Sequence, residues 1–140
     1  MEIKLRPMTI SDYDNVIAVW EAAGLHIDPV DDSKFSIAWL LAHNTTSCFV
    51  AEVEGKVIGA VLGAYNGRRL WIYHLGVLPN YQKKGVGKKL VLAVTKACSE
   101  FGCPKISLAI MRDNLKVAGF YQKFGFYPVT DSVWFSKKID

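Results

Sequence analysis

Cysteine is scarce in this 140-residue chain, and its spacing supports neither disulfides nor a metal site. The three cysteines, Cys48, Cys98 and Cys103, are odd in number and form no C-x-x-C pair. A disulfide framework or a zinc site would need a different pattern. Cys98 lies in an apolar helical pattern, so we interpret it as a small buried hydrophobe and not as a nucleophile. Reduced thiols are typical of the cytoplasm, where we expect this protein, with no bound metal.

Long apolar runs and low-complexity tracts are also missing. The segment from Met1 to Pro7 alternates charged and apolar side chains, unlike the continuous apolar segment of a signal peptide. No stretch approaches the roughly 20 apolar residues of a membrane span, and no polar or proline-rich tract divides the chain. Apolar residues make up 51% of the sequence, which is enough for a core. We therefore expect a single domain over residues 1–140 and no association with membranes.

Positive charge is in modest excess, and its position is more informative than its amount. The net charge is +4, which permits an anionic partner without identifying one. Lys83, Lys84, Lys88 and Lys89 fall within seven residues, around two glycines. These basic residues lack the interleaved aromatic residues of single-strand-binding proteins, so we expect no nucleic-acid partner.

Apolar periodicity predicts an α+β fold with a mixed, mostly antiparallel sheet of about seven strands and about four helices. Helical spacing indicates helices near residues 11–24, around 35–40, over 87–101, and after Asn114 through Lys123. Alternation and turn signals indicate strands at 3–6, 48–53, 57–62, 70–77, 105–109, 127–130 and 133–137. Glu54-Gly55 joins two of these strands in a hairpin pattern, and Gly102 and Gly125 are placed to end the last two helices.

The segment between the strand ending near Pro79 and the long helix is rich in glycine and lysine. Such a loop can direct several backbone N–H groups and the positive end of the helix dipole at a pyrophosphate. An ordinary turn with solvated lysines is the alternative. A Walker loop does not fit, because Gln82 stands where its first glycine belongs and Lys89 where its Ser or Thr belongs. The dinucleotide fingerprint does not fit either, because Leu90 replaces its third glycine.

This loop resembles the signature Q/R-x-x-G-x-G/A of the GNAT superfamily of acetyl-CoA-dependent N-acetyltransferases, matched here by Gln82 to Gly87. The preceding L-x-V-x-P, Leu75 to Pro79, resembles the end of the family's fourth strand. A second family pattern, N-x-x-A-x-x-x-Y-x-x-x-G-F, follows in the expected order. It is matched by Asn114, Tyr121, Gly125 and Phe126, with Val117 in place of its alanine.

The resemblance implies a donor site between the fourth and fifth strands, which splay apart in this family to admit the pantetheine arm. Backbone amides at Leu75, Gly76 and Val77 would hold the arm and polarise the thioester carbonyl. Gly76 is compatible with a β-bulge at this point. The pyrophosphate would be held by Gln82, Lys83, Lys84, Gly85, Val86, Gly87 and Lys88. Asn114 would contact the cofactor arm.

The resemblance also implies two proton-transfer roles, a general acid for the leaving thiolate and a general base for the attacking amine. Tyr121 takes the position of the family's tyrosine, near the thioester sulfur, where it would protonate the leaving thiolate. Its other interpretation is a core aromatic residue beside Phe120 and Phe124. The family often places a carboxylate on the fourth strand as general base, but residues 70–75 contain none.

His74 is our candidate for the missing base, because imidazole gains and loses a proton near neutral pH. Strand alternation could turn it away from the side that Tyr73 and Leu75 face. Tyr73 could instead line the acceptor cleft or order a water molecule, and His26 and His43 have weaker claims.

The acceptor is expected to be an amine. The resemblance assigns its recognition to the first two helices, the loop between them and the terminal hairpin. Aspartates in that loop could attract a cationic amine, or could merely solvate the loop or cap the next helix. These parts supply Trp20, His26, Asp28, Asp31, Asp32, Trp39 and Trp134.

We therefore expect an N-acetyltransferase that moves the acetyl group of acetyl-CoA to a primary amine in a ternary complex, acting as a monomer or homodimer. The alternative is a non-catalytic acyl-CoA-binding or sensing domain, which the missing carboxylate keeps open.

Overall fold

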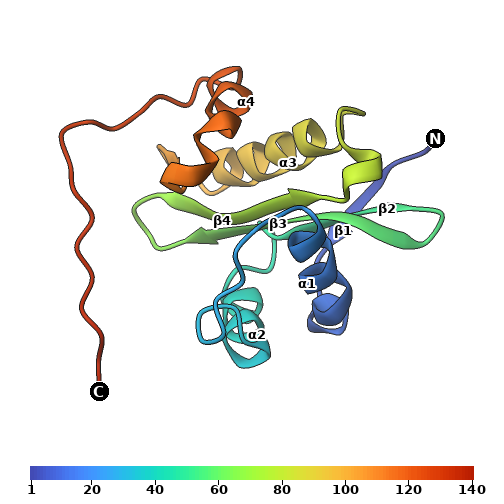
Figure 1. Cartoon of the computed structure of the whole chain (residues 1–140), viewed down its shortest axis with the longest axis horizontal. Helices are drawn as coiled ribbons and strands as arrows, with labels where there is room; N and C mark the ends of the chain where they lie inside the picture. Colours follow the sequence, from blue (N-terminus) through green and yellow to red (C-terminus); the bar gives the residue numbers. More distant parts are fainter. The chain divides into compact units, whose positions relative to one another are not determined.

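The computed structural model describes all residues 1–140, with five β-strands and four α-helices (Figure 1). Residues 1–109 and residues 110–140 form two compact units, and each is described by itself. The strands are β1 (Lys4–Pro7), β2 (Phe49–Val53), β3 (Lys56–Tyr65), β4 (Leu70–Val77) and β5 (Ile106–Leu108). The α-helices are α1 (Tyr13–Ala22), α2 (Lys34–His43), α3 (Val86–Glu100) and α4 (Ala118–Gln122). Short 3-10 helices are η1 (Ile10–Asp12), η2 (Pro79–Tyr81) and η3 (Arg112–Val117).

The five strands form one sheet in the order β1-β2-β3-β4-β5. The first four strands pair antiparallel, and β5 runs parallel to β4. The predicted hairpin is confirmed, because Glu54 and Gly55 join β2 to β3 with positive φ angles of 50° and 77°. Two successive positive φ angles are what a type I′ hairpin turn requires. The parallel pair needs a crossover, which α3 supplies. The α+β class with a mixed, mostly antiparallel sheet is therefore confirmed.

Helices cover both faces of this sheet. Figure 1 shows α1 and α2 on one face and α3 on the other. In α1, the buried residues Val16, Val19 and Trp20 lie three and four positions apart, on one helical face. Cys98 lies on the buried face of α3, and burial raises the pKa of its thiol to about 12. Its interpretation as a buried hydrophobe is thus confirmed.

The bulge expected at Gly76 is wrong; it lies at Tyr73. On β3 and β4, Leu62 pairs with His74 and Gly63 with Ile72, so Tyr73 has no partner across the strand. Gly76 pairs regularly with Ala60, so a bulge does not explain why glycine is required at this position. A Cβ atom at Gly76 would lie 2.7 Å from Trp20 Cδ1, closer than carbon atoms can approach.

The two terminal strands expected at 127–130 and 133–137 are absent, so the sheet has five strands instead of about seven. The alternation of apolar and polar residues in these two segments predicts extended strands, but both segments have no regular secondary structure. A strand also needs a neighbour for its backbone hydrogen bonds, and two short strands alone are at best marginal. Val133 and Phe135 are accordingly 82% and 88% exposed.

The helix expected after Asn114 and through Lys123 is shorter than predicted. Residues up to Val117 belong to the 3-10 helix η3, so the α-helix is limited to α4. The predicted end is confirmed, because Gly125 has a φ of 91° and donates its N–H to Gln122 O at 3.0 Å.

An ion pair fixes the start of α1 to the first strand. Arg6 donates from Nη2 to Asp12 Oδ1 at 2.7 Å and from Nη1 to Asp12 Oδ2 at 2.9 Å. Asp12 Oδ2 also accepts the N–H of Thr9 at 2.9 Å. The hydrogen bond from Arg6 is the main cause that holds the pKa of Asp12 below its usual value of 3.8. Stability from this pair is therefore present above that pH and lost as the pH falls.

Asp12→Asn is expected to lower the free energy of unfolding at pH 7 by about 1.5–3 kcal/mol, because it removes charge-assisted hydrogen bonds from a buried site. The difference from the parent protein should shrink below pH 4, where the parent must protonate Asp12 as it unfolds. Urea denaturation at several pH values measures it. Asp14→Asn, an exposed change two residues away, is the control. Equal effects of the two variants at pH 7 would contradict this role.

Candidate active site

Beyond its short contact with β5, strand β4 has an open edge. The pairing of β4 with β5 covers Leu70 to Ile72 only and ends at the pair Ile72–Leu108. Residues 73–77 continue β4 without a partner on that side. The pairing ends there because β5 itself ends at Leu108. The open edge contains Leu75, Gly76 and Val77, the residues expected to hold the pantetheine arm.

The loop after this edge presents unpaired backbone donors. Lys83 and Gly85 both have positive φ angles, 61° and 85°, and α3 begins at Val86. The backbone N–H groups of residues 83–88 donate to no acceptor within the chain. The turn thereby exposes these amides at the positive end of a 15-residue helix. Free amides at a helix N-terminus are well suited to binding phosphate groups.

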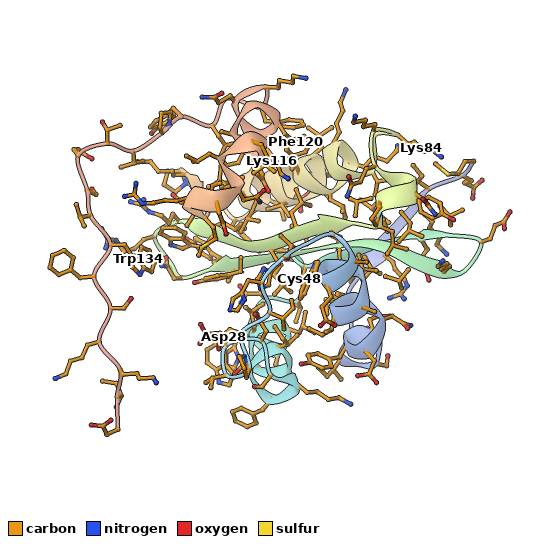
Figure 2. The ribbon with its side chains drawn as sticks, in the orientation of Figure 1. Asp28, Cys48, Lys84, Lys116, Phe120 and Trp134 are labelled. Atoms are coloured by element: carbon orange, nitrogen blue, oxygen red, sulfur yellow. The ribbon has the colours of Figure 1, made fainter.

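Gln82 has a different position from the rest of the loop. Its side chain donates from Nε2 to Val77 O at 2.9 Å, and its N–H lies 3.3 Å from Pro79 O. Both donors are thus engaged within the chain, and Gln82 fastens the loop to the end of β4. Lys84 lies on the exposed loop before α3, with its Nζ 5.8 Å from the centroid of the Tyr81 ring (Figure 2). It adds mobile positive charge beside the free amides.

His74 faces the side of β4 covered by α1. Its ring centroid lies 4.8 Å from that of Trp20, and its Nε2 lies 2.9 Å from Asp32 Oδ1. The side chains of His74 and Asp32 are 17% and 8% exposed. The bulge at Tyr73 interrupts the simple alternation of β4, so counting residues could not settle which way the imidazole points. The contact with Asp32 was not predicted, and the sequence holds no local signal for it.

The three aspartates of the α1–α2 loop have different surroundings. Asp28 Oδ1 accepts the N–H groups of Val30 and Asp31, each at 2.8 Å, so Asp28 shapes the loop (Figure 2). Asp31 is exposed. Asp32 is buried against His74, and it does not cap α2, because Ser33 Oγ accepts the N–H of Ser36 there.

Tyr121 and Asn114 belong to the unit of residues 110–140. The Tyr121 ring packs edge-on against Phe120, with centroids 5.1 Å apart, and against Phe126 at 5.6 Å. Burial raises the pKa of Tyr121 to about 12, so the phenol keeps its proton at neutral pH. Asn114 donates its N–H to Met111 O at 2.8 Å, and its side-chain amide has no hydrogen-bond partner in the chain.

The remaining candidates for acceptor recognition differ in exposure. Trp20 is fully buried and donates from Nε1 to Ala60 O at 3.2 Å, so it cannot contact an acceptor, and its inclusion was wrong. Trp39 is 58% exposed and stacks on His43, with ring centroids 3.7 Å apart. His26 is exposed. Trp134 is 74% exposed and donates to Ser136 Oγ at 2.9 Å.

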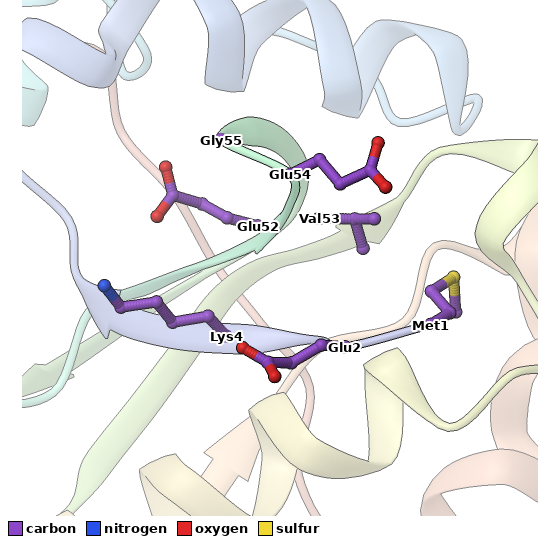
Figure 3. A pocket seen from close by; sticks show the side chains of 7 residues that line it. All are labelled: Met1, Glu2, Lys4, Glu52, Val53, Glu54 and Gly55. Atoms are coloured by element: carbon purple, nitrogen blue, oxygen red, sulfur yellow. The ribbon is translucent and has the colours of Figure 1, made fainter.

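A cavity of about 430 Å³ lies away from these residues, between the start of the chain and the β2–β3 turn (Figure 3). It contains none of the predicted site residues. No group of three or more His, Cys, Asp or Glu side chains could hold a metal ion, and no helix is long and apolar enough to cross a bilayer. The cavity is lined by Met1, Glu2, Lys4, Glu52, Val53, Glu54 and Gly55.

The family profile described as the acetyltransferase (GNAT) family matches residues 13–126. The chain belongs to this family. This GNAT acetyltransferase is 33% identical over 137 residues to an acetyltransferase of Yersinia enterocolitica. The alignment covers 98% of this chain and 96% of that protein. It is 36% identical over 131 residues to an acetyltransferase of Sodalis glossinidius, covering 94% and 91%.

Solved structures share the fold of this GNAT acetyltransferase. The PaiA N-acetyltransferase of Thermoplasma acidophilum, in complex with coenzyme A, has a TM-score of 0.81 at 21% identity over 95% of this chain and 94% of that one. An aminoglycoside acetyltransferase from an uncultured soil metagenomic sample, in complex with trehalose, has a TM-score of 0.75 at 24% identity over 99% and 97%. The protein is thus an acyl-CoA-dependent N-acetyltransferase, with acetyl-CoA as its cosubstrate.

Proposed function

We propose that this enzyme transfers the acetyl group of acetyl-CoA to a primary amine of a small molecule or protein, by direct attack in a ternary complex, as one cytoplasmic domain. The observation that carries the proposal is the run of free amides at residues 83–88, directly after the open edge of β4. The free amides suit a diphosphate, and the open strand edge suits an extended arm that ends in a thioester. Coenzyme A joins both groups in one molecule.

The donor half of the site uses mainly backbone groups. The amides of residues 83–88 bind the pyrophosphate, with Lys83, Lys84 and Lys88 adding charge, while Gln82 holds the loop in place. Backbone groups of Leu75, Gly76 and Val77 bind the pantetheine arm and polarise the thioester carbonyl. Asn114 contributes its free side-chain amide to the same arm.

The chemistry needs one proton acceptor and one proton donor. The neutral amine nitrogen attacks the thioester carbon, forming the new C–N bond, and the C–S bond then breaks. The proton lost by the amine goes to His74, directly or through water, and the thiolate takes the Tyr121 phenolic proton. Binding both reactants side by side supplies much of the rate acceleration. No covalent acetyl-enzyme forms.

A non-catalytic acyl-CoA-binding or sensing role is the second candidate, favoured by the lack of a carboxylate in residues 70–75 of β4. Release of free thiol from acetyl-CoA, measured with a panel of amines, separates the two roles. Aminoglycosides belong in the panel because a structural neighbour is an aminoglycoside acetyltransferase. Polyamines, lysine peptides and peptides with free N-termini complete it. Amine-dependent thiol release supports catalysis, and CoA binding without turnover supports sensing.

Charge reversal in the loop tests the donor site directly. Lys84→Glu and Lys88→Glu are each expected to weaken acetyl-CoA binding about tenfold at low salt, because an attractive charge near the pyrophosphate becomes repulsive. The loss should diminish as ionic strength rises. Isothermal titration calorimetry measures Kd for acetyl-CoA and for CoA.

Lys34→Glu is the matched control, since it makes the same charge change at an exposed position on α2, across the sheet from α3 (Figure 1). Equal losses in all three variants would indicate a general charge effect instead of a local site. A parent protein that shows no binding heat with either ligand would overturn the proposed function.

A further inference from the structure

We propose that Asp32 is a positioning residue, which holds the His74 imidazole with its proton on Nε2 and leaves Nδ1 as the atom that accepts the proton of the amine. The inference rests on the proposed function and deepens it. It links the loop between α1 and α2 to proton transfer on β4, through two residues 42 positions apart in the sequence.

The tautomer follows from the chemistry of the two partners. His74 Nε2 lies 2.9 Å from Asp32 Oδ1. An ionised carboxylate can only accept hydrogen bonds, so the proton between the two atoms belongs to Nε2. In a neutral imidazole, the other nitrogen then carries a lone pair and no proton. Nδ1 of His74 is therefore the basic atom.

Nδ1 is also accessible. It makes no hydrogen bond within the chain. No buried side-chain nitrogen or oxygen atom of the protein lacks a hydrogen-bond partner, so an unpartnered Nδ1 must reach solvent. A water molecule can thus contact this atom.

Asp32 is itself held in place. Its Oδ2 accepts the N–H of Asp28 at 2.8 Å, and its own N–H donates to Asp28 O at 3.0 Å. Its carbonyl oxygen accepts the Tyr13 hydroxyl at 2.6 Å. Among the ion pairs of the chain, the only cationic partner of Asp32 is His74. The carboxylate can therefore stabilise the positive charge that His74 acquires when it takes a proton.

Trp20 packs against the imidazole ring of His74. Its ring lies 4.8 Å from that of His74 at an interplanar angle of 46°, and the indole is fully buried. The same indole approaches the backbone at Gly76, where it excludes any Cβ atom. Trp20 thus contacts both His74 and the part of the open edge that holds the thioester in the proposed function. Asp32 and Trp20 together leave the imidazole little freedom to rotate.

The first test reads the tautomer without any assay of activity. Proton–nitrogen correlation spectra of ¹⁵N-histidine-labelled protein, at an alkaline pH, show which ring nitrogen of each of the three histidines carries hydrogen. We expect Nε2–H for His74. His43 is the internal reference and should show Nδ1–H, because its Nδ1 lies 2.8 Å from the carbonyl oxygen of Trp39. His74→Gln assigns the signal. Nδ1–H at His74 in the parent protein would overturn the inference.

The second test separates positioning from binding. Asp32→Asn introduces an amide that can donate as well as accept, so the preference for Nε2–H should be lost and kcat should fall about 100-fold. Kd for acetyl-CoA should stay unchanged. Glu100→Gln, the same loss of a carboxylate charge at an exposed position at the end of α3, should alter neither quantity. Thiol release with the acceptor found in the amine panel gives kcat and KM.

The two proposals fail in different ways. Absence of acetyl-CoA binding would remove the proposed function. Normal binding and turnover in the parent, together with an unchanged tautomer and kcat in Asp32→Asn, would remove only the role of Asp32. Should Asp32→Asn fail to fold, the tautomer of the parent protein still decides between support and rejection.

Discussion

Tyr121→Phe is expected to lower kcat about 100-fold or more while leaving Kd for acetyl-CoA within about twofold, if Tyr121 protonates the leaving thiolate. Phenylalanine keeps the ring that packs against Phe120 and Phe126 and loses only the hydroxyl. Loss of turnover with retained binding is the mark of an interaction made in the transition state. Steady-state thiol release and calorimetry measure the two quantities.

Tyr127→Phe is the matched control, because Tyr127 is 68% exposed and lies outside the family pattern. It should leave kcat unchanged. The pH profile gives a further check: burial raises the pKa of Tyr121 to about 12, so loss of its proton should not limit the rate between pH 7 and about pH 10. Unchanged turnover in Tyr121→Phe would leave Tyr121 as a packing residue only.

Gly76→Ala is expected to lower the free energy of unfolding by about 1–3 kcal/mol, because it overpacks a closely packed region. The new methyl group would meet Trp20 Cδ1 at 2.7 Å, Leu25 Cδ1 at 3.1 Å and Ala23 Cβ at 3.4 Å. Trp20 is fully buried and hydrogen-bonded to Ala60, so it cannot easily move aside. Urea denaturation, followed by tryptophan fluorescence, measures the change.

Gly119→Ala provides the control for this substitution. Gly119 lies in α4 with nothing within 4 Å of the added methyl group, and alanine favours a helix over glycine by about 1 kcal/mol, so the change should be neutral or stabilising. Because Trp20 also touches His74, Gly76→Ala should shift the imidazole signals of His74 and spare those of His43. Equal stability of Gly76→Ala and Gly119→Ala would contradict the close approach of Trp20.

Features that depend on neighbouring residues were predictable from sequence. The hairpin at Glu54-Gly55 follows from turn chemistry, and the buried face of α3 follows from a spacing of three and four residues. The loop of residues 82–87 is likewise local, because its glycines permit the turn that frees the backbone amides before α3. The family pattern also identified Tyr121 as a candidate catalytic residue, but it did not predict which side chains pack around the Tyr121 ring.

Features that depend on distant residues were not predictable. The terminal segments 127–130 and 133–137 alternate as strands do, but alternation supplies no pairing partner, and they remain without one. The bulge at Tyr73 comes from the register between β3 and β4, which a single strand does not specify.

The sequence by itself determined the family, the α+β class and the glycine-containing turn before α3, because each rests on short-range spacing along the chain. Only the tertiary structure decided why position 76 must be glycine, which way His74 points, and that Asp32 holds it. These last features arise where α1, its following loop and β4 pack together. Contacts between residues 42 positions apart leave no periodic trace in the sequence, since folding alone brings them within hydrogen-bonding distance.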